Sequence, residues 1–289
     1  MQVRRQSEFA RHKGYEIASI TDVPQNILEK IVWQKEREVA QMYANESLDA
    51  VKAKLVNVQP ARDFYGRLQN SLTHPALIAE VKKASPSKGV FREDFNPQAI
   101  AKAYEIGGAS CLSVLTDADF FQGGFENLQL VRQVVDLPLL CKEFIIDPYQ
   151  IYWGRSHGAD AILLITAILT DADLSELQAL IHQLGMTALV EVHTQEELDR
   201  VLQIPDVRLI GINNRNLENF VVELEQTKIL MDRLDQATRD KYLWVSESGI
   251  YTRQDLDFVQ SCGARSVLVG ESLIKQENIE GAITNLLDK

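Results

Sequence analysis

The sequence predicts an α/β protein folded as a (β/α)₈ TIM barrel with an N-terminal helical extension. From residue 76 onward, short apolar runs alternate eight times with amphipathic stretches, at a spacing of roughly 20–35 residues per strand–helix unit. Most runs are rich in Leu, Ile and Val and lack polar alternation, as expected for parallel strands covered on both faces. An open doubly wound sheet is the alternative, but it usually has fewer strands and a glycine-rich first turn. Neither feature is present.

The apolar runs are the expected strands, and the stretches between them have helical features. Residues 171–181 carry acidic side chains in their first turn and leucines at helical spacing. Residues 194–198 begin with a threonine followed three residues later by glutamate, the pattern of a capping box. Residues 252–260 continue the scheme. The expected strands are residues 77–81, 110–115, 138–141, 161–165, 188–192, 209–212, 243–246 and 266–269.

The first 75 residues do not follow this repeat. A helix is expected over residues 27–41, with apolar side chains on one face, and a second one from residue 47 to near residues 57–60. We therefore divide the chain into an N-terminal arm that is mobile or loosely packed, a helical extension packed on the barrel, and the barrel itself. The extension could cover either the bottom of the barrel or its mouth. The three parts are residues 1–25, 26–75 and 76–289.

Composition describes an ordinary globular protein and excludes several classes of partner. Of its 289 residues, 45% are hydrophobic and 25% are charged. The net charge of −11 argues against nucleic acid, which needs a basic surface, but not against a small anionic ligand. Cys111, Cys141 and Cys262 are widely spaced, so we expect free thiols in a reducing compartment. No run is long enough for a membrane helix, and no signal peptide is recognisable. We expect a cytoplasmic protein.

Charged and polar side chains gather at the expected carboxyl ends of the strands, where barrels of this kind place their chemistry. Glu80 and Lys82 end the first strand and point to the same face. Two charges on a strand buried on both sides are costly unless they are paired or used. A surface charge pair is the alternative for this segment taken alone. Other strands end in Lys142 and Phe144, Glu191 and His193, Asn213 and Arg215, Glu247 and Ser248, and Glu271.

These side-chain types suit acid–base chemistry on a phosphorylated, partly apolar ligand. A lysine flanked by glutamates suits a general acid, because carboxylates sustain its charge, and a nearby glutamate suits a base. A phosphate site is expected after the last two strands, where Gly249 and Gly270 let the backbone approach a ligand. Glu271 would repel a phosphate, so we expect its backbone N–H to contribute, not its carboxylate. Apolar side chains at the same level are Phe91, Phe121, Phe144, Leu163 and Ile165.

Several motifs resemble those of the indole-3-glycerol phosphate synthase family of tryptophan biosynthesis. Residues 78–89 (Ile-Ala-Glu-Val-Lys-Lys-Ala-Ser-Pro-Ser-Lys-Gly) resemble the family's first-strand signature. The resemblance covers about residues 25–289. It implies a carboxy-lyase without metal or cofactor, which converts 1-(2-carboxyphenylamino)-1-deoxyribulose 5-phosphate to indole-3-glycerol phosphate, carbon dioxide and water. Further motifs follow in the family's order at residues 112–116, 121–124, 139–145, 189–193, 211–217, 246–250 and 269–272.

The resemblance also implies roles for individual residues. Lys142 resembles the general acid that protonates the substrate's carbonyl oxygen, and Glu191 the base or electrostatic partner of the later dehydration. Asn213 resembles the residue that orients the substrate hydroxyls. Glu80 and Lys82 resemble a charged pair that positions the substrate and assists proton transfer, and which lysine serves which transfer stays open. The remaining implied residues are Ser248, placed with the catalytic set, then Ser85, Arg215 and Glu247 as polar contacts, Gly249, Gly270 and Glu271 at the phosphate, and Phe121, Phe144, Leu163 and Ile165 around the anthranilate ring.

Two other functions remain open at this point. A phosphoribosylanthranilate isomerase would share the fold and the phosphate site, but it usually relies on a Cys/Asp pair where this chain has Lys and Glu. A non-catalytic barrel that only binds partners would be expected to have lost charged strand ends, and none is missing. The expected partner is a small phosphorylated substrate, with no nucleic acid and no membrane. We expect a monomer, and transient contact with other tryptophan-pathway enzymes is compatible with this function.

Overall fold

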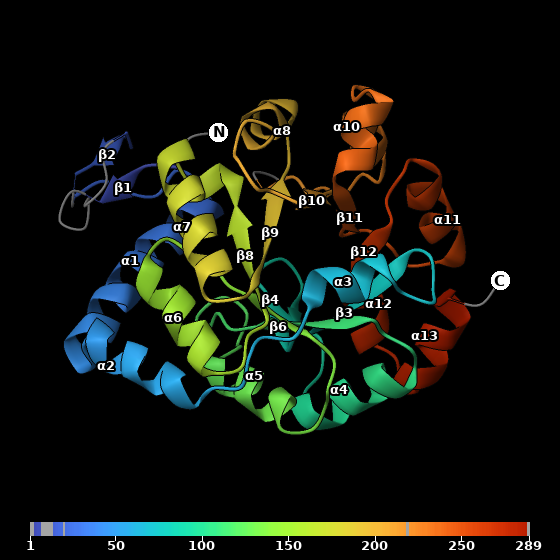
Figure 1. Ribbon diagram of the computed structural model, residues 1–289, viewed down its shortest axis with the longest axis horizontal. Coiled ribbons are helices and arrows are strands. Elements are labelled where there is room, and N and C mark those ends of the chain that lie inside the picture. The colour runs from blue at the N-terminus through green and yellow to red at the C-terminus, as the bar shows by residue number, and fades with distance from the viewer. Residues whose placement is uncertain (1–2, 7–13, 20, 218–219, 288–289) are drawn as a thin grey trace.

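The barrel predicted from the sequence is confirmed. The computed structural model describes residues 3–6, 14–19, 21–217 and 220–287. In this part of the chain, eight parallel strands close into a barrel in the order β10–β11–β12–β3–β6–β7–β8–β9 (Figure 1). The strands are β3 (Ala76–Val81), β6 (Cys111–Leu115), β7 (Leu139–Lys142), β8 (Ala161–Ile165), β9 (Thr187–Val192), β10 (Leu209–Asn213), β11 (Leu243–Glu247) and β12 (Ser266–Val269).

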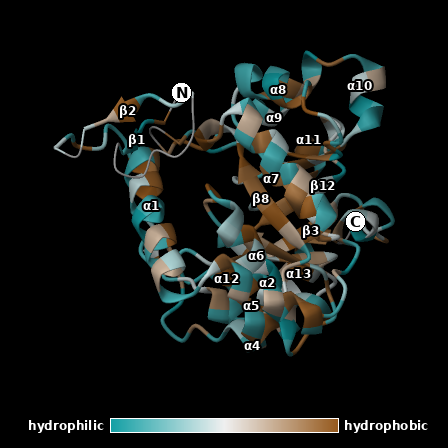
Figure 2. Cartoon of the chain, turned by 60° about the vertical axis from the view of Figure 1, so that its left-hand side comes forward, coloured by the Kyte–Doolittle hydropathy of each residue, from teal (hydrophilic) through white to brown (hydrophobic). Residues whose placement is uncertain are grey.

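Each barrel strand lies within one residue of its expected bounds at either end. The reason is burial: every residue of β6, β8, β10 and β11 is buried, so these strands read as continuous apolar runs. Figure 2 shows the apolar colour concentrated on barrel strands such as β8, whereas the surrounding helices mix polar and apolar residues. The strong signal for the strands is therefore a direct consequence of the closed, doubly covered sheet.

The helices that surround the barrel begin at polar capping residues. Thr170, Thr194 and Thr252 each accept a hydrogen bond from a backbone N–H of the first turn. The reciprocal capping box expected at Thr194 is absent there and forms at Thr252. The helices are α4 (Pro97–Ile106), α5 (Phe125–Arg132), α6 (Pro148–Ser156), α7 (Asp171–Gln183), α8 (Gln195–Val201), α9 (Glu225–Asp232), α10 (Gln236–Lys241), α11 (Arg253–Ser261), α12 (Glu271–Ile274) and α13 (Ile279–Leu287), with a 3₁₀ turn at Thr166–Ile168.

The N-terminal extension covers both ends of the barrel. Its elements are α1 (Ile27–Asn45), α2 (Leu48–Lys54), a 3₁₀ turn (Leu55–Asn57) and α3 (Phe64–Gln69), which the sequence did not predict. α1 and α2 lie beside α6 (Figure 1), and the start of α1 reaches the mouth. α3 lies at the bottom, where Arg67 Nε donates to the carbonyl of Ser110, just before β6. Both placements considered from the sequence therefore occur.

The described part of the N-terminal arm differs from the loosely packed segment that we expected. β1 (Arg5–Gln6) pairs in parallel with β2 (Ile17–Ala18). Val3 and both residues of β1 are buried, and Arg4 donates to both carboxylate oxygens of Glu29 on α1 at 2.9 Å. This bidentate pair fastens the arm to the extension. Residues 1–2, 7–13 and 20 lie outside the described residues.

Within the described ranges, no helix is long and apolar enough to cross a membrane. Cys111, Cys141 and Cys262 are free and buried.

Candidate active site

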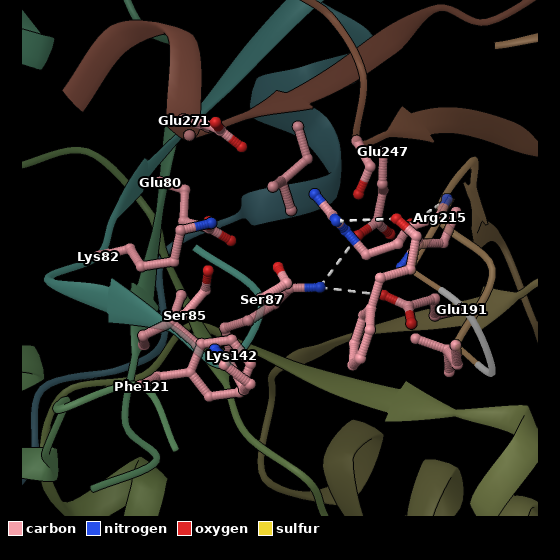
Figure 3. Close-up of a pocket in the computed structure, with 18 of the residues that line it drawn as sticks. Glu80, Lys82, Ser85, Ser87, Phe121, Lys142, Glu191, Arg215, Glu247 and Glu271 are labelled. Carbon is pink, nitrogen blue, oxygen red and sulfur yellow. Dashed lines mark hydrogen bonds and ion pairs between the residues drawn. The ribbon is translucent and has the colours of Figure 1, made fainter. Parts of the chain in front are cut away.

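All the site residues expected from the sequence line one cavity at the carboxyl ends of the barrel strands. The labelled carboxylates and lysines converge there from different strands (Figure 3). The arrangement follows from parallel strands, whose carboxyl ends all open on the same side. Lining residues that the sequence did not single out for the site include Leu28, Ser87, Leu217, Tyr251 and Leu268.

Lys142 stands between two carboxylates on the floor of this cavity. Its Nζ lies 2.9 Å from Glu191 Oε2 and 3.0 Å from Glu247 Oε2 (Figure 3). Burial by itself would lower the pKa of the lysine, but Glu191 and Glu247 outweigh it and raise that pKa above its ordinary value. Lys142 is therefore charged at neutral pH and can donate a proton into the cavity.

The two carboxylates beside Lys142 differ in protonation. Lys142 and His193 together outweigh burial and hold the pKa of Glu191 well below its ordinary value. Burial and the nearby Glu191 raise the pKa of Glu247 to about 8, against the opposing effect of Lys142. One cation thus faces one ionised and one mostly protonated carboxyl at neutral pH, so an acid and a base lie within reach of one ligand.

Glu247 has room for its carboxyl only because its neighbour on β10 is a glycine. A Cβ at Gly211 would overlap Glu247 Oε1. That oxygen is buried and has no hydrogen-bond partner among the described residues. The charged form of the carboxyl therefore lacks a stabilising hydrogen bond at this oxygen, which favours the neutral form.

The raised pKa of Glu247 predicts a pH-dependent stability. The folded state still holds the Glu247 proton at pH values above the ordinary pKa of a glutamate. The stabilisation that this proton gives the folded state is complete below that ordinary pKa, and it is lost as pH rises through about 8. In Glu247→Gln we expect a flatter dependence of the unfolding free energy on pH. The wild-type slope should be steeper by up to about 1.4 kcal/mol per pH unit, the limit for one proton. Urea unfolding from pH 5.5 to 8.5 measures both slopes, and parallel curves would contradict the assignment.

Glu80 and Lys82 form a second charged pair at the mouth. The two side chains make an ion pair with each other, and Lys82 Nζ also lies 5.2 Å from the ring centroid of Phe91. Gly270 leaves the space that Glu80 occupies, because a Cβ there would crowd its carboxylate. The pair therefore points into the cavity and is not the surface pair considered from the sequence.

An apolar wall closes one side of the cavity. The rings of Phe121 and Phe144 lie 5.9 Å apart, centroid to centroid. The N-terminal extension contributes the apolar face of α1 to the same cavity. Leu163 and Ile165 come from β8, and Ile27, Leu28 and Ile31 from α1.

A buried ion cluster joins α1 to the loops that carry these two rings. Lys35 Nζ lies 2.7 Å from Asp117 Oδ2, 3.2 Å from Glu143 Oε1 and 2.6 Å from Glu38 Oε2. Its side chain is 3% exposed, and those of Asp117 and Glu143 are 0% and 1% exposed. Burial opposes the charge on Lys35, but the carboxylates outweigh it and raise its pKa.

The same carboxylates hold the backbone of the aromatic wall. Asp117 Oδ1 accepts from the N–H groups of Phe120 and Phe121, at 2.7 and 3.0 Å. Glu143 Oε1 accepts from the N–H of Phe144 at 2.8 Å. Lys35 is thus the shared counter-ion of the two residues that orient the wall. The sequence offered no signal for this cluster, because its members lie far apart in the chain.

Gly249 and Gly270, where we expect the phosphate, line the same cavity directly after β11 and β12. Gly249 has a φ of +84°, which suits glycine, and Gly270 immediately precedes α12. Lys275 Nζ, directly after α12, lies 2.7 Å from Glu271 Oε1, so this carboxylate has a cationic partner. Ser248 adopts a φ of +68°, and its carbonyl accepts from Asn214 Nδ2 at 3.0 Å.

The remaining expected residues are also fixed by local contacts. Asn213 Oδ1 accepts from the N–H of Arg215 at 3.0 Å, and Arg215 Nη1 donates to the carbonyl of Phe220 at 3.3 Å. Ser85 lies in β4 (Ala84–Ser85), which pairs with β5 (Gly89–Val90) as a short hairpin over the cavity. In the described part of the chain, no group of three His, Cys, Asp or Glu side chains is arranged to hold a metal ion.

The chain is similar over most of its length to proteins of one family. The family model described as indole-3-glycerol phosphate synthase matches residues 28–286. Proteins of that name from Rippkaea orientalis and Crocosphaera subtropica are 56% and 58% identical to the chain. The first match covers 99% of both proteins, and the second covers 94% of this chain and 93% of the relative.

Solved structures at low sequence identity support the fold alone. An N-acetylmannosamine-6-phosphate 2-epimerase from Clostridium perfringens matches with a TM-score of 0.55 and 16% identity, over 74% of this chain and 93% of that one. KGPDC from Streptococcus mutans matches with a TM-score of 0.56 and 14% identity, over 74% and 96%.

Proposed function

The chain belongs to the indole-3-glycerol phosphate synthase family of carboxy-lyases, and we propose that Lys142 is the general acid of its reaction and Glu191 the base or electrostatic partner. The family closes the indole ring of 1-(2-carboxyphenylamino)-1-deoxyribulose 5-phosphate in tryptophan biosynthesis, with loss of carbon dioxide and water. The observation that carries the proposal is the position of Lys142 Nζ, 2.9 Å from Glu191 and 3.0 Å from Glu247.

The ring closure needs an acid at the substrate's carbonyl oxygen. As the aryl carbon attacks, negative charge develops on that oxygen, and Lys142 can neutralise it by donating a proton. The attack also leaves positive charge on the aryl-amine system, which the ionised Glu191 stabilises. The later loss of the hydroxyl group as water needs an acid and a base together, and Glu191 supplies the base.

The other site residues bind and orient the substrate in this proposal. Phe121, Phe144, Leu163 and Ile165 enclose the anthranilate ring, which excludes water and holds the aryl carbon near its electrophile. Glu80 positions Lys82, and Lys82 pairs with the substrate carboxylate or assists a proton transfer. Asn213, Ser248, Arg215, Glu247 and Ser85 make polar contacts, and the backbone at Gly249, Gly270 and Glu271 binds the phosphate.

The role of Glu191 can be tested by separating the two products in time. In Glu191→Gln we expect carbon dioxide to be released faster than the indole chromophore appears, because decarboxylation precedes the dehydration that Glu191 serves. A single-turnover experiment that follows carbon dioxide and indole fluorescence together measures the two rates. The dehydration should slow by about 10²-fold or more. If both signals slow equally, the step that depends on Glu191 is the ring closure and not the dehydration.

We also propose that the protein works as a cytoplasmic monomer, with transient contact with other tryptophan-pathway enzymes. Its three buried free cysteines suit a reducing compartment. None of the cysteines lines the cavity in the described part of the chain, which disfavours the Cys/Asp chemistry of an isomerase.

A further inference from the structure

His193 directly follows β9 and has no part in the proposed chemistry, yet its ring lies beside the proposed base. Its Nε2 lies 3.2 Å from Glu191 Oε1, within ion-pair distance but without the geometry of a hydrogen bond. Its Nδ1 lies 3.2 Å from Glu197 Oε2 on α8. Glu191 Oε2 in turn lies 2.9 Å from Lys142. Acidic and basic groups therefore alternate in a row that runs from α8 into the cavity, in the order Glu197, His193, Glu191 and Lys142. Glu191 is held between two cations, one at each oxygen.

The position of the His193 ring is fixed from two sides. Glu197 Oε2 accepts from the backbone N–H of His193 at 2.7 Å, so one carboxylate holds both the backbone and the ring. Gln226 Nε2 on α9 donates to the His193 carbonyl at 2.7 Å. The side chains of His193, Glu191 and Glu197 are 8%, 3% and 6% exposed. Glu197 bonds His193 instead of closing the capping box that the sequence predicts at the start of α8.

The charges around this ring favour the imidazolium form. Burial by itself would lower the pKa of His193, but Glu191 and Glu197 raise it to about 9. From α9, the neutral amide of Gln226 binds the backbone carbonyl of His193 and brings no charge to the ring. Glu191 faces Lys142 from β7 and Glu247 from β11. The negative charge of Glu191 raises the pKa of Glu247. Without the cation at His193, Glu191 and Glu247 would compete for Lys142 alone.

We propose that His193, anchored by Glu197, is a positioning residue that keeps Glu191 ionised and turns its second oxygen toward Lys142. The inference rests on the proposed role of Glu191 and adds a second contributor to it. His193 touches Glu191 and acts on the reaction through it. The consequence is a base that stays ionised to lower pH than Lys142 alone would ensure.

The test is the pH dependence of single turnover in two variants. In His193→Gln the acidic limb of the rate profile should move up by about one pH unit, because Glu191 loses a cation. The rate near neutral pH should fall on the order of 10-fold, with KM within about twofold. In Glu197→Gln the imidazole remains, but it loses the carboxylate that helps to raise its pKa. His193 should therefore lose its proton at lower pH, and the alkaline limb of the rate profile should move to lower pH. The matched control is His182→Gln on α7, whose profile should equal that of the wild type.

The outcomes separate this inference from the proposed function. If Glu191→Gln blocks dehydration but neither limb moves in the two variants, the positioning role is wrong and the function stands. If Glu191→Gln turns over normally, the role of Glu191 itself fails. A uniform loss of rate with an unchanged profile would show that His193 only supports folding, and thermal unfolding of each variant accompanies the kinetics. Should His193→Gln not fold, Glu197→Gln decides the question by itself.

Discussion

Replacing Lys142 with alanine should abolish turnover while a phosphorylated ligand still binds. The acid that protonates the carbonyl oxygen would be lost, and general acid catalysis contributes about 10²–10⁴-fold. In our proposal the phosphate is held by the backbone around Gly249 and Gly270, which follow β11 and β12, whereas Lys142 ends β7, so affinity for the product should change little. Indole fluorescence measures turnover, and calorimetric titration with indole-3-glycerol phosphate measures binding.

The outcome of Lys142→Ala also separates the two lysines of the site. Lys102→Ala, an exposed position on α4, is the matched control and should behave as the wild type. Near-normal turnover in Lys142→Ala would assign the first proton transfer elsewhere, with Lys82 as the next candidate. Loss of binding together with turnover would mean that Lys142 also holds the site in shape. Only loss of turnover with retained binding supports the general acid.

Replacing Lys35 with methionine should lower the free energy of unfolding by about 3–5 kcal/mol, the range for removing one partner of a buried ion pair. Asp117 and Glu143 would then share a buried site without their cation. Both carboxylates orient the backbone of the aromatic wall, so KM for the substrate should rise as well. Urea unfolding and steady-state kinetics measure the two effects.

The deficit of Lys35→Met should depend on pH with a defined sign. Removing the cation raises the pKa of the buried carboxylates in the folded state, and that of Glu143 is already raised by burial. The folded variant would bind more protons than the unfolded chain, so its stability should fall as pH rises above the ordinary carboxylate range. The control is Lys30→Met on the exposed face of the same helix. A deficit below about 1 kcal/mol, as for a surface pair, would contradict the importance of the cluster.

The barrel and the composition of its mouth could be predicted from the sequence for one physical reason. Strands buried on both faces have no need of polar residues until they end, so each polar strand end stands out against an apolar run. Glu80, Lys142, Glu191, Asn213 and Glu247 were all found in this way. Because parallel strands open on the same side, the fold class also implied that these residues meet.

Contacts between distant segments could not be predicted by the same reasoning. α3 is a short helix without a clear pattern, and the arm is held at Arg4 by Glu29, a residue of α1 that is distant in the sequence. Lys35 looked like one of several charges on a solvated helix, and nothing local marks Asp117 and Glu143 as its partners. The sequence did show the apolar face of α1 that contributes to the mouth, but it did not show which end of the barrel it covers.

The fold class, the family and the set of side chains at the mouth can be predicted from the order of residues, because they depend on local pattern and on the geometry common to all such barrels. How those side chains share charge depends on the folded structure. Lys142 lies within ion-pair distance of both Glu191 and Glu247, and His193 lies beside the other carboxylate oxygen of Glu191. The protonation of each group depends on burial and on distances of about 3 Å between side chains from different strands. Neither quantity can be obtained from the order of residues along the chain.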